Sequence, residues 1–209
     1  MNKEFARLGI FGGTFDPPHI GHLILASEAL TQLSLDCVLW VLTHFPPHKA
    51  GQPITPLADR LNMLHAALDH DPAFKISHID IDRPPPHYAI DTVQLLHEQY
   101  PSARLVYLMG SDSLVDLPLW HKPKEFILKC DELGVMRRPG EDENLELLES
   151  QLPGLSRRLR FIDAPLLEIS STELRRKIAK DGSFRYYLPP GVYKIIRQRS
   201  YYTDSTDSQ

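Results

Sequence analysis

The chain contains little cysteine: Cys37 and Cys130 are the only two among 209 residues. With no Cys-x-x-Cys spacing they form neither a disulfide framework nor a zinc-finger ligand set, and they favour a reducing, intracellular setting. No apolar run is long enough to cross a bilayer, and residues 1–4 lack the apolar stretch of a signal peptide. We therefore expect a cytoplasmic protein with no membrane partner.

An excess of positive charge is also lacking. The 23 Lys and Arg residues against 27 Asp and Glu residues give a net charge of −4, which argues against nucleic acid as a partner. Positive side chains do gather at residues 137–138, 157–158 and 175–177. A solvated face is the simplest interpretation of each group, and we keep it for residues 157–158.

Composition and patterning favour a folded α/β protein. The 42% apolar content supports a globular core, and expected strands and helices alternate without an internal repeat or a long linker. We predict a doubly wound, Rossmann-like parallel sheet with helices on both faces and a small C-terminal helical portion. Residues 1–202 are expected to form this single domain, and residues 203–209 (TDSTDSQ) a disordered tail with nothing to bury.

Hydrophobic periodicity places the elements along the chain. The expected strands end at residue 11 or cover residues 36–42, 104–109 and 133–136, with an extended segment at 74–81. The expected helices cover residues 20–33, 59–70, 88–100 and 141–152, and one more follows residue 170. Ligands of parallel sheets collect at the carboxyl ends of the strands, so we expect residues 12–22, 110–112 and 137–138 to share one crevice.

Residues 12–22 (GGTFDPPHIGH) carry the first group of candidate ligand-binding side chains. Gly12 and Gly13 let the backbone approach a ligand, and Thr14 adds a hydroxyl. His19 and His22 share one face at the start of a helix. Free backbone N–H groups and the helix dipole favour anions at that position, and imidazole donors add to the effect.

Three interpretations of this segment remain open. It is a structural corner with two partly exposed histidines, a zinc-binding pair, or a phosphate site. Zinc needs a third and usually a fourth ligand, which the two cysteines do not supply by their spacing. The phosphate interpretation is favoured because the glycines, the hydroxyl, the helix start and the histidines all suit one kind of ligand.

Residues 169–175 (ISSTELR) form the second group. Ser170 and Glu173 have the spacing of a capping box, while Leu174 and Ile178 provide a buried helix face. The plain interpretation is a well-capped helix. The functional one is a second anion site in which Arg175 adds charge to the cap's hydroxyls and N–H groups, and two such sites suit a triphosphate.

Three further segments have both structural and functional interpretations. The stiff turn at residues 46–49 presents His48 and Lys49, or is an ordinary proline loop. Trp120 offers a flat surface to an aromatic ring, or belongs to the core. Residues 83–88 (RPPPHY) lead rigidly into a helix and either close over a substrate or simply connect two elements.

Taken together, these motifs resemble those of the nucleotidyltransferases. Residues 12–22 have the form Gly-Gly-x-Phe-Asp-Pro-x-His-x-Gly-His, and residues 169–175 match Ile-Ser-Ser-Thr-x-x-Arg. More narrowly, the chain is similar to the bacterial nicotinate mononucleotide adenylyltransferases over nearly its whole length. The further matches are residues 46–49, Arg60 with Met63-Leu64, residues 110–112 with Trp120, residues 137–140, and Leu188-Pro189.

The resemblance implies a reaction of NAD biosynthesis. The 5′-phosphate of nicotinate mononucleotide attacks the α-phosphorus of ATP, and nicotinate adenine dinucleotide and pyrophosphate are released. No covalent enzyme intermediate is implied, so positioning and charge neutralisation would provide the catalysis. The partners would be ATP and a pyridine mononucleotide, with Mg²⁺ bound mainly through the ATP phosphates and no metal held by protein ligands. The oligomeric state stays open.

The resemblance also implies roles for individual residues. The catalytic group would be His19, His22 and Arg175. The ATP-binding group would be Gly12, Gly13, Thr14, Phe15, Gly21, Gly110, Asp112, Arg137, Ser170, Ser171 and Thr172. The group binding the mononucleotide would be Asp16, His48, Lys49, His87, Tyr88, Ala89 and Trp120.

One departure bears on the acceptor. Where the family usually has Ser-Tyr-Thr, this chain has His87-Tyr88-Ala89, so the threonine hydroxyl is missing. Backbone N–H groups at the helix start and His87 can still hold the nicotinate carboxylate, and we predict nicotinate as the preferred acceptor and nicotinamide as the alternative.

Other classes share parts of the pattern. A phosphopantetheine adenylyltransferase or a cytidylyltransferase would carry both signatures, but not Trp120 with residues 46–49 in this form. A class I tRNA-charging enzyme also has His-Ile-Gly-His, but it needs a lysine-rich second signature and an anticodon-binding domain that this sequence lacks. A non-catalytic nucleotide-binding module would bind ATP without releasing pyrophosphate.

Overall fold

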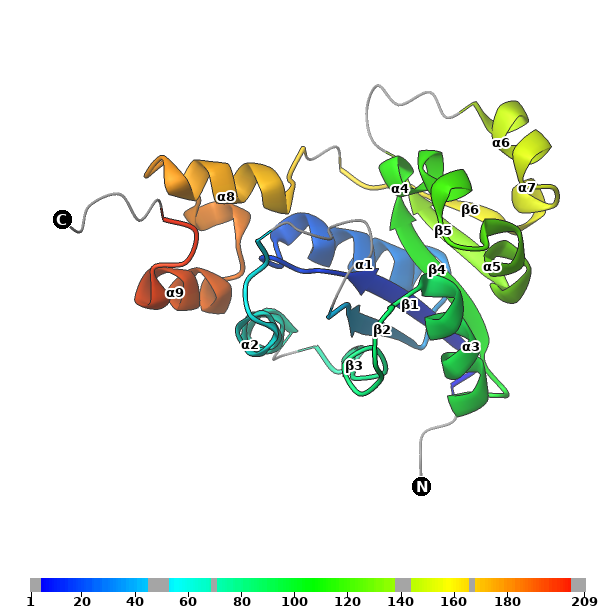
Figure 1. Cartoon of the computed structure of the whole chain (residues 1–209), viewed down its shortest axis with the longest axis horizontal. Helices are drawn as coiled ribbons and strands as arrows, with labels where there is room; N and C mark the ends of the chain where they lie inside the picture. Colours follow the sequence, from blue (N-terminus) through cyan, green and yellow to red (C-terminus); the bar gives the residue numbers. More distant parts are fainter. Residues whose placement is uncertain (1–4, 45–52, 69–70, 138–143, 166–167, 204–209) are drawn as a thin grey trace.

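A computed structural model describes residues 5–44, 53–68, 71–137, 144–165 and 168–203. Within these residues six parallel strands form one sheet in the order β3-β2-β1-β4-β5-β6 (Figure 1). They are β1 (Arg7–Gly13), β2 (Cys37–Leu42), β3 (Phe74–Ser77), β4 (Arg104–Gly110), β5 (Glu132–Met136) and β6 (Leu159–Ile162). The order reverses between β1 and β4, as in a doubly wound sheet, so the predicted fold class is confirmed.

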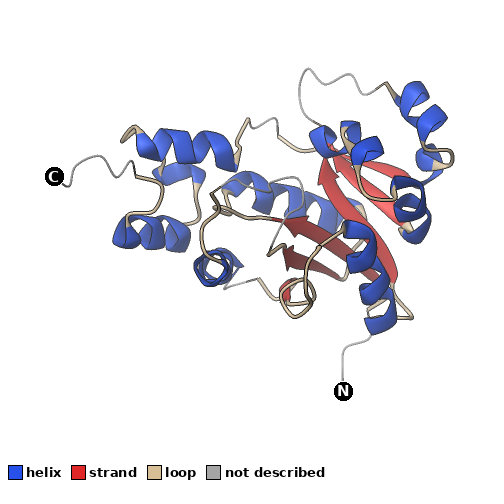
Figure 2. Cartoon of the chain, viewed as in Figure 1, coloured by secondary structure: helices blue, strands red, loops and turns tan. Residues whose placement is uncertain are grey.

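Helices cover both faces of this sheet (Figures 1 and 2). They are α1 (Ile20–Gln32), α2 (Leu57–Leu68), α3 (Ala89–Gln99), α4 (Ser111–Val115), α5 (Pro123–Lys129), α6 (Leu145–Gln151), α7 (Leu155–Arg158), α8 (Ser171–Ala179) and α9 (Pro190–Arg199). In the described part of the chain, no helix combines the length and the apolar character that a membrane span requires.

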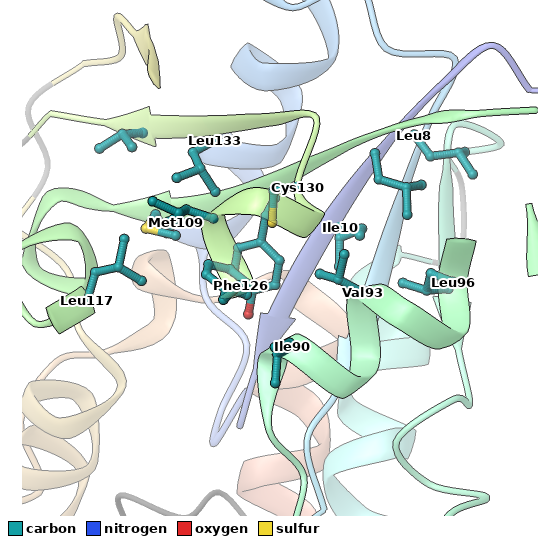
Figure 3. Packing of buried hydrophobic residues seen from close by; sticks show 14 of the residues in the cluster. Leu8, Ile10, Ile90, Val93, Leu96, Met109, Leu117, Phe126, Cys130 and Leu133 are labelled. Carbon is teal, nitrogen blue, oxygen red and sulfur yellow. The ribbon is translucent and has the colours of Figure 1, made fainter. Parts of the chain in front are cut away.

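The core is divided by the sheet into two apolar layers. In β2, Val38 and Trp40 face the layer under α1 and α2, whereas Leu39 and Val41 face the layer under α3 and α5. This alternation follows from the two-residue repeat of a strand, and because both layers are apolar, β2 is a continuous hydrophobic run. Figure 3 shows part of the layer under α3 and α5, with labelled side chains from β1, β4, β5, α3 and α5.

A third apolar cluster joins the C-terminal helices to the rest of the molecule. Leu174 and Ile178 of α8 pack with Val192 and Ile196 of α9 and with Met63 of α2. This cluster forms the predicted C-terminal helical portion, which lies at the opposite end of the molecule from α6 and α7 (Figure 1). It places the start of α8 beside the sheet edge where ligands are expected.

The structure corrects two boundaries and adds elements that periodicity did not predict. The extended segment expected at residues 74–81 ends at Ser77, because the N–H of Ile81 turns back to the carbonyl of His78 at 2.8 Å. The acidic helix begins only after Asn144, whose side chain caps it. The short elements α4, α5, α7 and β6 were not predicted. Residues 204–209 of the expected tail lie outside the described residues.

At the amino edge of the sheet one carboxylate joins several strands. Glu132, with 8% of its side chain exposed, lies 2.7 Å from Arg7, 3.3 Å from Arg104 and 3.7 Å from Arg160. These arginines come from β1, β4 and β6, so the charge of Glu132 ties four strands together. A carboxylate so nearly buried is stabilising only while its cationic partners surround it.

We expect Glu132→Gln to lower the free energy of unfolding by about 1–3 kcal/mol, because three guanidinium groups lose their anionic partner. Urea denaturation measures the change. Glu125→Gln is the matched control, since Glu125 is 61% exposed and meets Lys122 only at 4.0 Å. Equal stability losses in the two variants would contradict the role assigned to Glu132.

Candidate active site

The strand ends that the sequence predicts to meet lie where the strand order reverses. β1 and β4 are neighbours, with Ile10 opposite Tyr107, so Gly12 and Gly13 at the end of β1 lie beside the end of β4. Gly110 ends β4 and is the N-cap of α4, and Asp112 lies in the first turn of that helix. The carboxyl ends of β1 and β4 therefore bring these predicted residues together, as the sequence indicated.

His19 and His22 open α1 as a stacked pair. Their ring centroids lie 3.6 Å apart with an interplanar angle of 21°, and His19 is the N-cap. The backbone N–H of His19 donates to Nδ1 of His22 at 3.1 Å. Because Nδ1 accepts this bond, the neutral imidazole of His22 carries its proton on Nε2, which makes that atom a hydrogen-bond donor.

Close packing by neighbouring residues fixes the position of the histidine pair. Phe15 has a positive φ of 47°, and its ring, 2% exposed, packs at 5.1 Å from the ring of His22 and against Trp40. The ring of Phe15 therefore packs into the core beside the histidine pair, in which His19 is itself buried at 4% exposure. At Gly21 an added Cβ would lie 3.1 Å from the His19 ring, so a side chain there would press on the imidazole.

A buried arginine fixes the backbone of the turn after β1. Arg60 of α2 is 1% exposed, and its guanidinium donates to the carbonyl of Thr14 at 2.9 Å. It also donates to the carbonyls of Thr43 at 2.9 Å, His44 at 3.1 Å and Thr55 at 2.8 Å. Burial lowers the pKa of Arg60, and the nearby Asp16 carboxylate partly offsets this shift. The resemblance had pointed to Arg60 without giving it a structural role.

His44 connects this region with the loop before α3. Desolvation lowers the pKa of His44, and the charges of Arg60 and His87 lower it further. Its ring lies 6.1 Å from that of His87. Sequence reasoning missed His44, although it lies only two residues after the end of β2, where ligand-facing residues of such sheets are sought.

The second predicted anion site adjoins the first. The hydroxyl of Ser171 donates to the carbonyl of Pro17 at 2.9 Å, and Arg175 donates to the carbonyl of Asp16 at 2.8 Å. Two segments more than 150 residues apart thus share one corner of the molecule. Thr172 lies on the exposed side, near Arg175 at 3.5 Å.

The cap of α8 follows the prediction in part. The Ser170 hydroxyl accepts from the N–H of Glu173 at 3.1 Å, as a capping box requires. The Glu173 carboxylate instead accepts from Arg176 at 2.6 Å. The first-turn N–H groups of α8 and the Arg175 guanidinium together form a positive end suited to phosphate.

A second arginine shapes the loop that leads into α3. Arg83 pairs with the buried carboxylate of Asp80 at 3.0 Å and donates to the carbonyls of Pro86 at 2.8 Å and Tyr88 at 3.3 Å. The hydroxyl of Thr92 donates to Asp80 at 2.8 Å from inside the helix. This network fixes the position of Tyr88, the N-cap of α3. It thereby also fixes the free backbone N–H groups in the first turn of the helix, which begins at Ala89.

Aromatic side chains line the approach to that helix start. The ring of Tyr88 stacks on His121 at 3.9 Å, and the neighbouring Trp120 is half-buried, 5.3 Å from Phe126. Trp120 therefore serves the core and still exposes part of its ring. His87 is buried at 4% exposure, with Nε2 at 3.2 Å from the carbonyl of Arg83. Sequence reasoning missed His121, although it directly follows Trp120.

Three predicted residues remain, and the structure describes one of them, Arg137. The guanidinium of Arg137 lies 3.9 Å over the ring of Phe161 at the end of β5. His48 and Lys49 lie outside the described residues. In the described ranges no group of three or more His, Cys, Asp or Glu side chains could hold a metal ion. The zinc interpretation of the histidine pair therefore finds no ligand set among them.

The comparisons with known proteins agree on one family. A model of the cytidylyltransferase-like family matches residues 10–177. A nicotinate-nucleotide adenylyltransferase of Bacillus subtilis is 36% identical over 94% of this chain and 98% of its own length. A protein of Thermomicrobium roseum named a probable nicotinate-nucleotide adenylyltransferase is 44% identical over 94% of this chain and 92% of its own.

Solved structures of low sequence identity share the fold. The nicotinic acid mononucleotide adenylyltransferase of Plasmodium falciparum, complexed with NaAD, has a TM-score of 0.78 at 19% identity. The match covers 94% of this chain and 97% of that chain. The same protein complexed with APC has a TM-score of 0.75 at 18% identity, over the same shares of both chains.

We expect Arg60→Lys to lower the free energy of unfolding by about 2–4 kcal/mol, because one ammonium group cannot reach four carbonyls that a guanidinium spans. Thermal and urea unfolding measure the loss. Arg197→Lys is the matched control, because Arg197 is exposed on α9 and should change stability by less than about 0.5 kcal/mol. An unchanged stability in Arg60→Lys would refute the role of its four carbonyl contacts.

Proposed function

The chain belongs to the nicotinate-nucleotide adenylyltransferases of the cytidylyltransferase-like family, and from this premise we propose how its residues divide the work. The enzyme transfers the adenylyl group of ATP to nicotinate mononucleotide, giving nicotinate adenine dinucleotide and pyrophosphate in NAD biosynthesis. The observation that carries the proposed roles is the contact of Ser171 and Arg175 with Pro17 and Asp16. It brings two phosphate-binding helix starts to one place.

The ATP half of the site consists of the starts of α1 and α8. The Nε2–H of His22 and the ring of His19 face charge that develops on the α-phosphate as the acceptor oxygen attacks. Arg175, Ser171 and Thr172 hold the outer phosphates and the leaving pyrophosphate. The acceptor oxygen belongs to a phosphate that is already anionic, so no protein base needs to activate it, and orientation supplies most of the catalysis.

Mg²⁺ would be held by the ATP phosphates and not by a protein cage. Hydroxyls, imidazoles, N–H groups and guanidinium groups surround the two helix starts, and these groups bind phosphate oxygens. When bound, Mg²⁺ neutralises part of the triphosphate charge and needs few protein ligands. The donors of His22 and Arg175 would supply the remaining neutralisation.

The mononucleotide half consists of the start of α3 and the aromatic side chains beside it. The pyridine ring would pack near Tyr88 and Trp120, and the nicotinate carboxylate would accept from the free N–H groups at Ala89. Those groups point along the helix axis whatever the side chain, so alanine in place of threonine keeps them. His87 is held by the Arg83 carbonyl and supports the loop from within.

We also propose cytoplasmic location and a single domain spanning residues 1–202.

We predict that nicotinate mononucleotide is turned over at least about tenfold more efficiently than nicotinamide mononucleotide, because the helix start favours a carboxylate over a neutral amide. Dinucleotide formation from ATP and each acceptor gives both values of kcat/KM, and released pyrophosphate confirms the stoichiometry. A higher kcat/KM for the amide would overturn the acceptor assignment. ATP binding without pyrophosphate release would indicate a non-catalytic module.

We predict that His19→Ala lowers kcat by about 100-fold or more while the fold persists, because a donor at the reacting phosphate is lost. The paired measurement is kcat together with the midpoint of thermal unfolding. His65→Ala is the matched control, since His65 is exposed on α2 and away from both helix starts. A loss of activity matched by a loss of folded protein would show that His19 is only structural.

A further inference from the structure

The C-terminal turn brings a tyrosine back to the phosphate-binding corner. α9 ends at Arg199, and Ser200 and Tyr202 then have positive φ values of 52° and 65°. The hydroxyl of Thr203 holds this turn by donating to the carbonyl of Ser200 at 2.9 Å. The turn aims the Tyr202 side chain at a residue 186 positions earlier in the chain.

Tyr202 closes a hydrogen-bonded ring with Asp16 and Thr55. Its hydroxyl donates to Oδ1 of Asp16 at 2.6 Å and accepts from the hydroxyl of Thr55 at 3.2 Å. The N–H of Thr55 donates to Oδ2 of the same carboxylate at 3.3 Å. Asp16 is 3% exposed, and these two donors satisfy both of its carboxylate oxygens inside the protein. Burial and the Asp16 charge raise the pKa of Tyr202, which keeps its proton on the hydroxyl.

Two arginines, Arg60 and Arg175, lie near this buried carboxylate, and they differ in the number of hydrogen bonds that their guanidinium groups already donate. Arg60 interacts electrostatically with Asp16 but is bound to four carbonyls. Arg175 donates to the main-chain carbonyl of Asp16 and, more weakly, to Thr172. In the described part of the chain Arg175 has no carboxylate partner within ion-pair distance. It is thus the cation that an unsatisfied Asp16 carboxylate could attract.

We propose that Tyr202 is a positioning residue for ATP: by satisfying the Asp16 carboxylate, its hydroxyl keeps the Arg175 guanidinium available to the phosphates. The proposal rests on the proposed function of Arg175 as a phosphate ligand. Without the hydroxyl, Oδ1 of Asp16 has no donor among the residues that the structure describes, and a buried carboxylate gains from pairing with the nearest guanidinium. Asp16 then competes with the triphosphate for Arg175.

This role also accounts for the position of an acidic residue beneath a phosphate site. A free carboxylate there would repel a triphosphate. Donors on both oxygens disperse its charge, and the main-chain carbonyl of Asp16, not its carboxylate, orients Arg175. The sequence placed Asp16 in the mononucleotide-binding group, whereas these contacts assign it to the support of the ATP half.

The first test compares Tyr202→Phe with Tyr201→Phe. Tyr201 is the matched control, because its hydroxyl also interacts with a carboxylate, that of Asp59 on α2. We expect Tyr202→Phe to weaken the binding of the non-hydrolysable analogue α,β-methylene-ATP about tenfold, the scale of one charge-assisted hydrogen bond. Isothermal titration calorimetry measures it. KM for ATP should rise similarly while KM for the mononucleotide stays unchanged, and Tyr201→Phe should leave both at the wild-type value.

A double variant separates positioning from a merely structural role. Asp16→Asn removes the charge that would attract Arg175, so Asp16→Asn with Tyr202→Phe should bind the analogue more tightly than Tyr202→Phe alone. If Tyr202 only stabilises the fold, the second substitution adds to the damage and binding weakens further. Equal or weaker binding by the double variant would overturn the proposal, as would wild-type affinity in Tyr202→Phe.

The experiment keeps this proposal distinct from the proposed function. Analogue binding needs no acceptor and no turnover, so a wild-type protein that forms no dinucleotide would refute the activity and leave the comparison of variants intact. If Tyr202→Phe does not fold, Thr55→Val removes the donor to the Tyr202 hydroxyl and keeps the side-chain shape. It should weaken analogue binding about threefold, a smaller effect because Tyr202 still donates to Asp16. An unchanged affinity in Thr55→Val would count against the proposal.

Discussion

The corner proposed to bind ATP depends on one buried guanidinium. The turn after β1, the end of β2 and the approach to α2 are irregular segments whose carbonyls cannot pair within a sheet or helix. Arg60 satisfies one or more of these carbonyls in each segment. A buried charge without such partners would cost several kcal/mol, so the cation and the carbonyls stabilise one another. The histidine pair and the Asp16 network are built on the backbone that Arg60 fixes.

Arg83 has the same role in the loop before α3, the proposed acceptor half, and it also pairs with a carboxylate. It binds the carbonyls of the loop before α3 and adds the Asp80 carboxylate, which a helix hydroxyl also contacts. In each half of the site a planar cation with several donors organises a loop that has no regular hydrogen bonding of its own. The ligand-facing groups are then mostly backbone N–H groups at helix starts, whose direction is set by the helix and not by side-chain identity.

Local patterns predicted those parts of the molecule that local forces determine. The strand, turn and helix of residues 7–32 follow from an apolar run, small residues and helical periodicity, and the Ser170 cap follows from its spacing to Glu173. Strand β6 and helix α5 have four and seven residues, too few for periodicity to distinguish them from loops. The partners of Arg60 and Tyr202 come from distant segments, so no spacing in the sequence could reveal them. The motif that places Phe15 near ATP records its position in the chain but not the direction of its ring, which packs into the core.

The reversal of strand order between β1 and β4 has a consequence for how this protein can change. The connections leaving these two strands diverge to opposite faces of the sheet, so the position of the proposed site between them is set by the path of the chain and does not depend on a particular side chain. Side chains on its rim can therefore be exchanged without rebuilding the framework. The loss of the threonine hydroxyl at Ala89, relative to the pattern that the family usually has, is such an exchange. Evolution can retune the choice of acceptor at the rim while the phosphate chemistry below it is inherited unchanged.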